Sequence, residues 1–239
     1  MKNRSRGFGL VEIMVALVLG LIVSLGVIQI FIASRGTFVT QNTSARMQEE
    51  ARFVLSKMMQ EIRMTGMYGC LAFDTAVVAP AIIPPPALNS PILWDSASKT
   101  LTVISADVGN ASSAPTWTII SDCQKNSRVY AGARVPAAGQ TAFPLRQLAY
   151  SFDGSTLSLK VGGAAPQPLL QNVKKLDVSF GMAGPTLSYS TGSITAGNSE
   201  DVRSVRLTLI LTDPDGRVRD QEYNVVAQLR NSISASVSK

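Results

Sequence analysis

Two kinds of reactive side chain stand out in the sequence: a pair of cysteines, and one carboxylate among the apolar residues near the N-terminus. Cys70 and Cys123 are the only thiols, and the 239 residues include no histidine. The lack of histidine excludes Ser-His-Asp and Cys-His nucleophilic sites, imidazole general bases and most zinc sites. Two thiols are too few for a four-thiolate metal site. No pairing of serine with a lysine or aspartate base stands out either, so we expect no enzyme and no cofactor.

The carboxylate is Glu12, the only charged side chain between Gly7 and Arg35. A carboxylate inside a membrane-spanning segment is costly, and such residues usually have a function and a partner. The alternative is that Glu12 lies at the headgroup boundary, near the end of the segment.

The apolar stretch around Glu12 is long enough to cross a bilayer. From Ile13 to Ser34 there are 22 uncharged residues without a proline. At about 1.5 Å per residue, a helix of that length covers about 33 Å, against roughly 30 Å for a bilayer core. A cleavable secretory signal fits less well, because the apolar run is long and no small-residue cleavage site follows it. We therefore predict a membrane-spanning helix.

Basic residues before this stretch predict its orientation. Lys2, Arg4 and Arg6 supply half of the formal net charge of +6 and favour a cytoplasmic N-terminus. The rest of the chain would then lie outside the cytoplasm. Without these three residues the net charge is +3, and no cluster of Lys and Arg with interleaved aromatic residues follows. Nucleic-acid binding is therefore not expected.

The helix is predicted to continue beyond Arg35, because no proline occurs between Gly36 and Gly66. A helix from Phe8 to about Thr65 would be about 87 Å long. Apolar residues recur in its second part at helical spacing. They are Met47, Ala51, Val54, Leu55, Met58, Met59 and Ile62.

Strand patterns dominate the rest of the chain. The predicted strands are Thr100–Ser105, Thr116–Ser121, Leu145–Phe152, Ser155–Val161, Val173–Phe180, Val202–Thr212 and Arg217–Ala227. Asp-Gly sequences at 152–155 and 213–216 predict hairpin turns. A turn is preferred to a calcium site at Asp213 and Asp215, because the further carboxylates of a calcium loop are missing.

Two segments are predicted to be irregular. Leu71–Ser98 is rich in proline, which indicates surface chain of polyproline character, and a rigid loop packed on the domain is preferred to a ligand for a proline-binding module. Thr191–Asp201 is rich in Ser, Gly and Asn and is predicted to be a mobile loop.

An extracytoplasmic position would allow Cys70 and Cys123 to form a disulfide. In the chain-entropy model, closing a loop between these two residues stabilises the fold by roughly 4 kcal/mol. Two separate buried thiols are the alternative.

The N-terminal residues Arg6-Gly7-Phe8-Gly9-Leu10-Val11-Glu12 resemble the signal of type IV prepilins: a basic leader ending in Gly, a Phe, and a Glu four residues later. The resemblance implies cleavage after Gly7 and methylation of the new amine on Phe8. It also implies that Glu12 pairs with the Phe8 amine of a neighbouring subunit. The implied fold is α+β and type IV pilin-like, with a long N-terminal helix packed on an antiparallel β-sheet head domain.

This resemblance divides the chain into a cytoplasmic leader (1–7), a transmembrane half of the helix (8–34), an amphipathic half (35–69) and a β-rich extracytoplasmic head (70–239). Three further stretches resemble PilW-type minor pilins: Glu61–Cys70, Leu169–Gly181 and Tyr223–Asn231. The second also resembles J-type pseudopilins. Residues 71–144 resemble no family in particular.

The implied function is a minor pilin that helps prime type IV pilus assembly and lies at or near the pilus tip. Its partners would be other minor pilins, the major pilin, a tip adhesin, the inner-membrane assembly platform and the prepilin peptidase. It would lie first in the bacterial inner membrane and later on the pilus or cell surface. The alternative is a J-like minor pseudopilin of a type II secretion system.

Overall fold

A computed structural model describes residues 9–70, 86–107, 114–184, 186 and 188–230. The predicted leader, the residues Gly7 and Phe8, and most of the proline-rich segment lie outside these described residues. The chain divides into two compact units, with the boundary between Arg46 and Met47.

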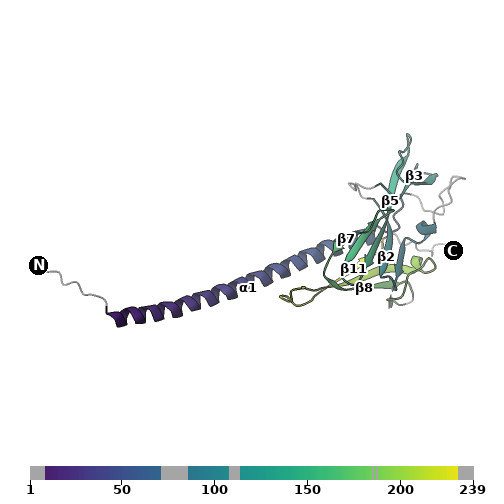
Figure 1. Ribbon diagram of the computed structural model, residues 1–239. Coiled ribbons are helices and arrows are strands. Elements are labelled where there is room, and N and C mark those ends of the chain that lie inside the picture. The colour runs from purple at the N-terminus through teal and green to yellow at the C-terminus, as the bar shows by residue number, and fades with distance from the viewer. Residues whose placement is uncertain (1–8, 71–85, 108–113, 185, 187, 231–239) are drawn as a thin grey trace. The chain divides into compact units, whose positions relative to one another are not determined.

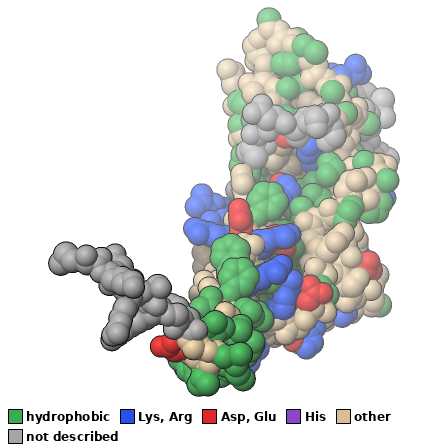
Figure 2. Space-filling model, turned by 60° about the vertical axis from the view of Figure 1, so that its left-hand side comes forward, with side chains coloured by type: hydrophobic (Ala, Val, Ile, Leu, Met, Phe, Trp, Pro, Cys, Tyr) green, Lys and Arg blue, Asp and Glu red, His purple; other side chains and the backbone are tan. Residues whose placement is uncertain are grey.

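Helix α1 extends from Leu10 to Arg63, and its first part has the composition of a membrane span (Figure 1). An 18-residue window of this helix has a mean hydropathy of 2.8, and none of that window is buried. Where Figure 2 shows the part of α1 next to the grey N-terminal residues, hydrophobic side chains cover most of it. By length and composition, α1 can therefore cross a bilayer.

The second half of α1 belongs to the head domain. Its buried residues are Met47, Ala51, Val54, Leu55, Met58 and Ile62. These are the residues of the predicted apolar face except Met59, which is half-buried against the same core. The expected face is therefore confirmed, because spacings of three and four residues keep side chains on one side of a helix.

The helix ends at Arg63, two residues before the predicted end near Thr65 and six before the limit of 69 given to the amphipathic half. Beyond it, Thr65 pairs with Ser105 in an isolated bridge, and the N–H of Gly66 donates to the carbonyl of Ile104 at 3.2 Å. Gly66 has a φ of 76°, which ends a helix and which glycine adopts without strain. These contacts with the sheet replace the next helical turn.

The head contains two antiparallel sheets (Figure 1). The first has the order β1-β2-β5-β3-β4, with β6 paired to β5 and β7 to β6. Its strands are β1 (Ile92–Asp95), β2 (Thr100–Ala106), β3 (Trp117–Ser121), β4 (Ser127–Ala131), β5 (Thr141–Phe152), β6 (Leu157–Val161) and β7 (Gln167–Leu170).

The second sheet has the order β11-β10-β8-β9. Its strands are β8 (Val173–Met182), β9 (Ser188–Ser190), β10 (Val202–Leu211) and β11 (Gln221–Gln228). Two short 3₁₀ helices, η2 (Pro86–Asn89) and η3 (Ser199–Asp201), complete the described elements.

One hydrophobic core joins the second half of α1 to residues of both sheets. Met58 and Ile62 of the helix are in the same buried cluster as Tyr150 of β5 and Phe180 of β8. A smaller cluster, around Ile104, Ile119 and Leu145, lies in the first sheet. The predicted α+β class, with a long N-terminal helix packed on antiparallel sheets, is confirmed.

Both segments predicted to be irregular contain short ordered parts. Within the proline-rich segment, Ile92–Asp95 forms strand β1, and Ile92 and Trp94 are buried. The loop Thr191–Asp201 is anchored in the head, because Ile194 pairs with Trp94 through two backbone hydrogen bonds, N–H to O at 3.0 and 2.9 Å. Ser199 Oγ also donates to the carbonyl of Ile92 at 2.7 Å.

Candidate functional site

Glu12 bends back to the beginning of its own helix. The carbonyl of Gly9 accepts the N–H of Glu12 at 3.0 Å and that of Ile13 at 3.3 Å, which makes Gly9 the first residue of the helical hydrogen-bond pattern. The N–H of Gly9 donates to Glu12 Oε2 at 3.3 Å. This is the returning half of a capping box, in which an acidic side chain in the first turn accepts an otherwise unpaired N–H.

The carboxylate is therefore directed toward the positive end of the helix dipole, next to the position of Phe8 in the sequence. Ala16 and Gly20 follow Glu12 at four-residue spacing, on the same side of α1. A Cβ atom built on Gly20 would meet no atom within 4 Å. Glu12 thus stands at the end of a strip of small residues, where the backbone of a second helix could approach closely.

Residues 2–28 match the family model described as the prokaryotic N-terminal methylation motif. The match is confined to this N-terminal segment. The matched range contains the predicted processing residues, Gly7 and Phe8, together with Glu12. The search of curated proteins finds no match.

Among solved structures, the chain is similar to a type IV-like pilin from Thermus thermophilus. The sequences are 14% identical, and the TM-score is 0.44. The similar region covers 78% of this chain and 97% of the other.

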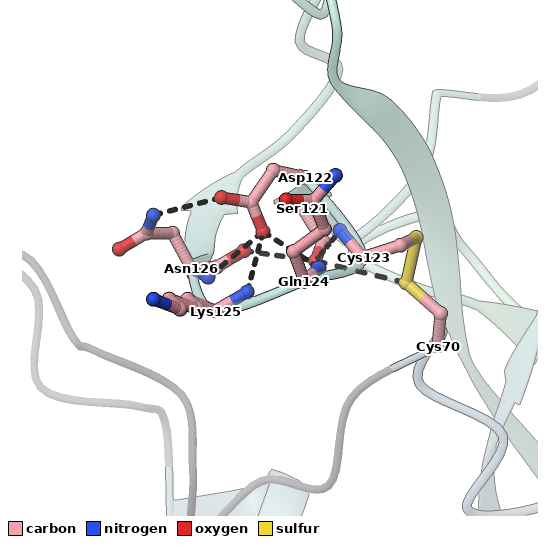
Figure 3. The surroundings of a disulfide bond; sticks show 7 residues. All are labelled: Cys70, Ser121, Asp122, Cys123, Gln124, Lys125 and Asn126. Atoms are coloured by element: carbon pink, nitrogen blue, oxygen red, sulfur yellow. Dashed lines mark hydrogen bonds between the residues drawn. A yellow bond between two sulfur atoms is a disulfide. The ribbon is translucent and has the colours of Figure 1, made fainter.

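A disulfide joins Cys70 to Cys123, with an S–S distance of 1.98 Å and a Cα–Cα distance of 5.4 Å (Figure 3). The predicted pairing is therefore confirmed, and the alternative of two separate thiols is wrong. Cys70 follows the end of α1, whereas Cys123 lies in the turn between β3 and β4. The bond thus connects the helix end to the first sheet.

Asp122 organises the turn that carries Cys123. Its Oδ1 accepts the N–H groups of Gln124, Lys125 and Asn126, each at 2.9 Å, and Asn126 Nδ2 donates to its Oδ2 at 2.7 Å (Figure 3). These hydrogen bonds, from the backbone of Asn126 first, hold the pKa of the Asp122 carboxyl well below its usual range.

Sequence reasoning missed the role of Asp122. The available signal was its position at the start of a turn, since aspartate side chains commonly accept backbone N–H groups two or three residues later.

A second polar group fixes the end of α1 on the first sheet. Glu61 accepts a hydrogen bond from Ser105 Oγ of β2 at 2.6 Å and from Lys57 Nζ at 3.4 Å. Its side chain is largely buried, so these contacts offset the cost of removing the carboxylate from water. The Glu61–Ser105 hydrogen bond thus joins α1 to β2 two residues before the helix ends.

Asp213 forms the predicted hairpin turn between β10 and β11. Its carboxylate accepts hydrogen bonds from Arg217 Nε at 3.1 Å, Nη2 at 2.9 Å and the backbone N–H at 2.8 Å. The side-chain hydrogen bond from Arg217 is the main reason why the pKa of Asp213 lies well below its usual range. Among the described residues, no group of three or more acidic or thiol side chains could hold a metal.

Proposed function

We propose that this chain is a PilW-type minor pilin of the type IV pilus. It helps prime pilus assembly with other minor pilins and lies at or near the tip with an adhesin. The methylation motif at 2–28, at the start of an apolar helix that continues into the head domain, is the main observation in support. A contact surface, with no catalytic role, is what we propose for the head.

Maturation would begin with hydrolysis of the Gly7–Phe8 peptide bond by the prepilin peptidase, followed by methylation of the Phe8 amine. The Glu12 carboxylate already accepts the N–H of Gly9, one residue from that amine. In a filament, Glu12 would pair with the Phe8 amine of a neighbouring subunit. Both charges are costly in an apolar helix bundle, and pairing offsets that cost.

The proposed location is the inner membrane at first, with a cytoplasmic N-terminus and a periplasmic head, and then the pilus or cell surface. Major pilin, other minor pilins, a tip adhesin and the assembly platform are the proposed partners. Deletion of the chain should reduce surface pili and twitching motility while major pilin synthesis continues.

The alternative is a J-like minor pseudopilin of a type II secretion system. The stretch Leu169–Gly181, which here forms the end of β7 and most of β8, resembles both families and therefore keeps this second candidate open. Normal piliation with blocked secretion of exoproteins after deletion would support the pseudopilin and contradict the pilus proposal.

The most informative experiment is co-purification from detergent extracts with the other minor pilins. We expect Glu12→Ala to insert and to be cleaved, but to recover its partners poorly. Glu49→Ala is the matched control, because Glu49 is an exposed acid on the part of α1 that belongs to the head. Equal recovery of partners by the wild-type chain and Glu12→Ala would contradict the proposed pairing.

A further inference from the structure

Strand β11 forms one edge of the second sheet. It pairs with β10 from Gln221 to Gln228 without a register shift, and among the described residues no strand pairs with its other side. Edges of natural sheets are usually short or carry a proline, a lysine or a bulge, which prevents pairing with another chain. None of these features occurs in β11, whose sequence is Gln-Glu-Tyr-Asn-Val-Val-Ala-Gln. Its only charge is Glu222.

The other edge strands in the described part of the head are better protected. Strand β9 has three residues, β1 has four, and β7 has four including Pro168. Strand β4 has five and carries the exposed Arg128. With eight residues, β11 is therefore the longest of these edges and the most open to pairing.

The hydrogen bonds between β10 and β11 identify the backbone groups on this edge. The N–H of Leu229, just beyond β11, donates to the carbonyl of Arg203 at 3.0 Å. Since backbone groups alternate in direction along a strand, the odd-numbered residues of β11 bond to β10. The even-numbered residues therefore direct their N–H and C=O groups away from the sheet. They are Glu222, Asn224, Val226 and Gln228.

The side chains of β11 form an apolar margin that the described residues cover only in part. On the core side, Tyr223 and Val225 are half-buried where they pack against the main core. On the opposite face all side chains of the strand are exposed, and that of Val226 is 45% exposed. A further strand would cover the core side of this margin and bond to the outward backbone groups. The edge therefore fits an extended segment with apolar residues at alternate positions.

The charge at the beginning of β11 adds a second requirement for that segment. Among the described residues, no cation forms an ion pair with Glu222, and its carboxylate accepts a hydrogen bond from Asn224 Nδ2 at 2.9 Å. The nearby Lys175 is paired with Asp177 at 2.6 Å. A basic side chain opposite Glu222 would therefore complement this edge, whereas an acidic one would be repelled.

A second copy of this chain does not suit the edge. Antiparallel pairing of β11 with the β11 of a second copy would relate the two chains by a two-fold axis perpendicular to the sheet. Residues 47–63 of α1 belong to the head, and Met58 shares the main core with Phe180 of this sheet. The two-fold axis would make these helical segments run in opposite directions. Two chains anchored in one membrane with the proposed orientation cannot adopt that arrangement.

We propose that an extended segment of a different minor pilin pairs with β11 and adds a fifth strand to the second sheet. The segment carries apolar side chains on the core side, opposite Val225 and its neighbours, and a basic side chain opposite Glu222. This inference rests on the proposed function, and it assigns the contact between the head and its partners to one strand.

Residue-resolved hydrogen exchange tests this contact on the full chain in detergent, alone and in the complex recovered with the other minor pilins. We expect the amides of Asn224, Val226 and Gln228 to exchange more slowly in the complex, by about tenfold or more. The amides of Val225 and Ala227 bond to β10 and serve as the internal standard, because their exchange should be the same in both samples.

Two substitutions at one position form a matched pair. Val226→Pro removes an outward N–H that takes no part in the pairing with β10, and proline is accepted at such edge positions. It should lower the recovery of partner pilins by about tenfold, because one hydrogen bond is lost and the ring obstructs the approach of a strand. Val226→Thr keeps the N–H and should recover the partners as the natural chain does. Unchanged exchange at Val225 and Ala227 verifies that Val226→Pro is folded.

The outcomes separate this contact from the pilus proposal. Partner pilins recovered without slower exchange at Asn224 and Gln228 would overturn the contact alone, as would equal recovery by Val226→Pro and the natural chain. Recovery of no partner by the natural chain would overturn both proposals. Slow exchange of the same amides in the chain alone would also overturn the contact. The edge would then be covered from within the chain or, if the protection increases with protein concentration, by a second copy.

Discussion

Gly7 is the residue whose size the proposed maturation requires most directly, because a peptidase must reach the peptide bond that follows it. We expect Gly7→Val to block cleavage by crowding that bond, and mass mapping of membrane-extracted protein to find Met1 at its N-terminus. The unsubstituted chain should begin at a methylated Phe8. Recovery of an intact Met1 terminus from the unsubstituted chain, in a host with active peptidase, would contradict the proposed processing.

Gly69 is required for a different reason, since both its conformation and its surroundings exclude a side chain. Its φ is 123°, and a Cβ atom there would lie 2.9 Å from Cδ2 of Phe143. We expect Gly69→Ala to lower the free energy of unfolding by about 1–3 kcal/mol, measured by chemical denaturation.

Gly132→Ala separates the two causes. Gly132 has a φ of 71°, but a Cβ atom there would meet nothing within 4 Å. Its substitution should therefore show the cost of the backbone conformation alone. If the free energy of unfolding falls by the same amount in both variants, the contact between residue 69 and the Phe143 ring does not contribute to the loss in Gly69→Ala.

Asp122 makes the head sensitive to acid. Its pKa is lower in the folded chain than in the unfolded one, mainly because of the backbone N–H of Asn126. Its stabilising contribution is therefore complete above the unfolded value of about 3.9 and is lost as the pH falls toward the folded value. We expect Asp122→Asn to be less stable than the natural chain at pH 7, and this difference to shrink below about pH 4.

Denaturant unfolding at several pH values measures this effect. Glu200→Gln, at an exposed acid in η3, is the control and should leave the profile unchanged. A constant difference between Asp122→Asn and the natural chain at all pH values would mean that the charge of Asp122 does not stabilise the turn.

At the scale of elements, the sequence predicted the parts whose signal is local. It did not predict the parts whose position depends on long-range contacts. The apolar face of α1 was predictable because its spacing repeats within a few residues. Strand β1 was not, because Ile92–Asp95 is short and follows Pro91. Its position depends on Ser199, which is 107 residues away. The turn at Asp122 depends on local hydrogen bonds, so its signal was present in the sequence but had no periodicity.

The second half of α1 is part of the head core, and its two faces should respond differently to truncation. Met58 is fully buried, so Met58→Ala should cost about 2–5 kcal/mol in the free energy of unfolding. Phe53 lies on the same helix with 61% of its surface exposed, and Phe53→Ala should change the stability by less than about 0.5 kcal/mol. Similar losses in the two variants would mean that the helix packs on the head through another face.

At the scale of the whole molecule, the oxidation state of Cys70 and Cys123 can be used to determine which compartment the head occupies. The Cys70–Cys123 bond forms and persists in an oxidising compartment, and the proposed orientation places the head there. That orientation depends on Lys2, Arg4 and Arg6, because positive residues beside a membrane span are retained in the cytoplasm.

Replacing these three basic residues together with Glu should therefore leave a large share of the heads in the cytoplasm, with Cys70 and Cys123 as free thiols. Thiol alkylation followed by peptide mapping measures the share of each form. The control variant replaces Lys125, Arg128 and Lys160 with Glu, which makes the same change in net charge at exposed positions of the head. It should form the disulfide as completely as the natural chain does. Complete disulfide formation in the leader variant would show that the basic residues before the span do not determine the orientation of the chain.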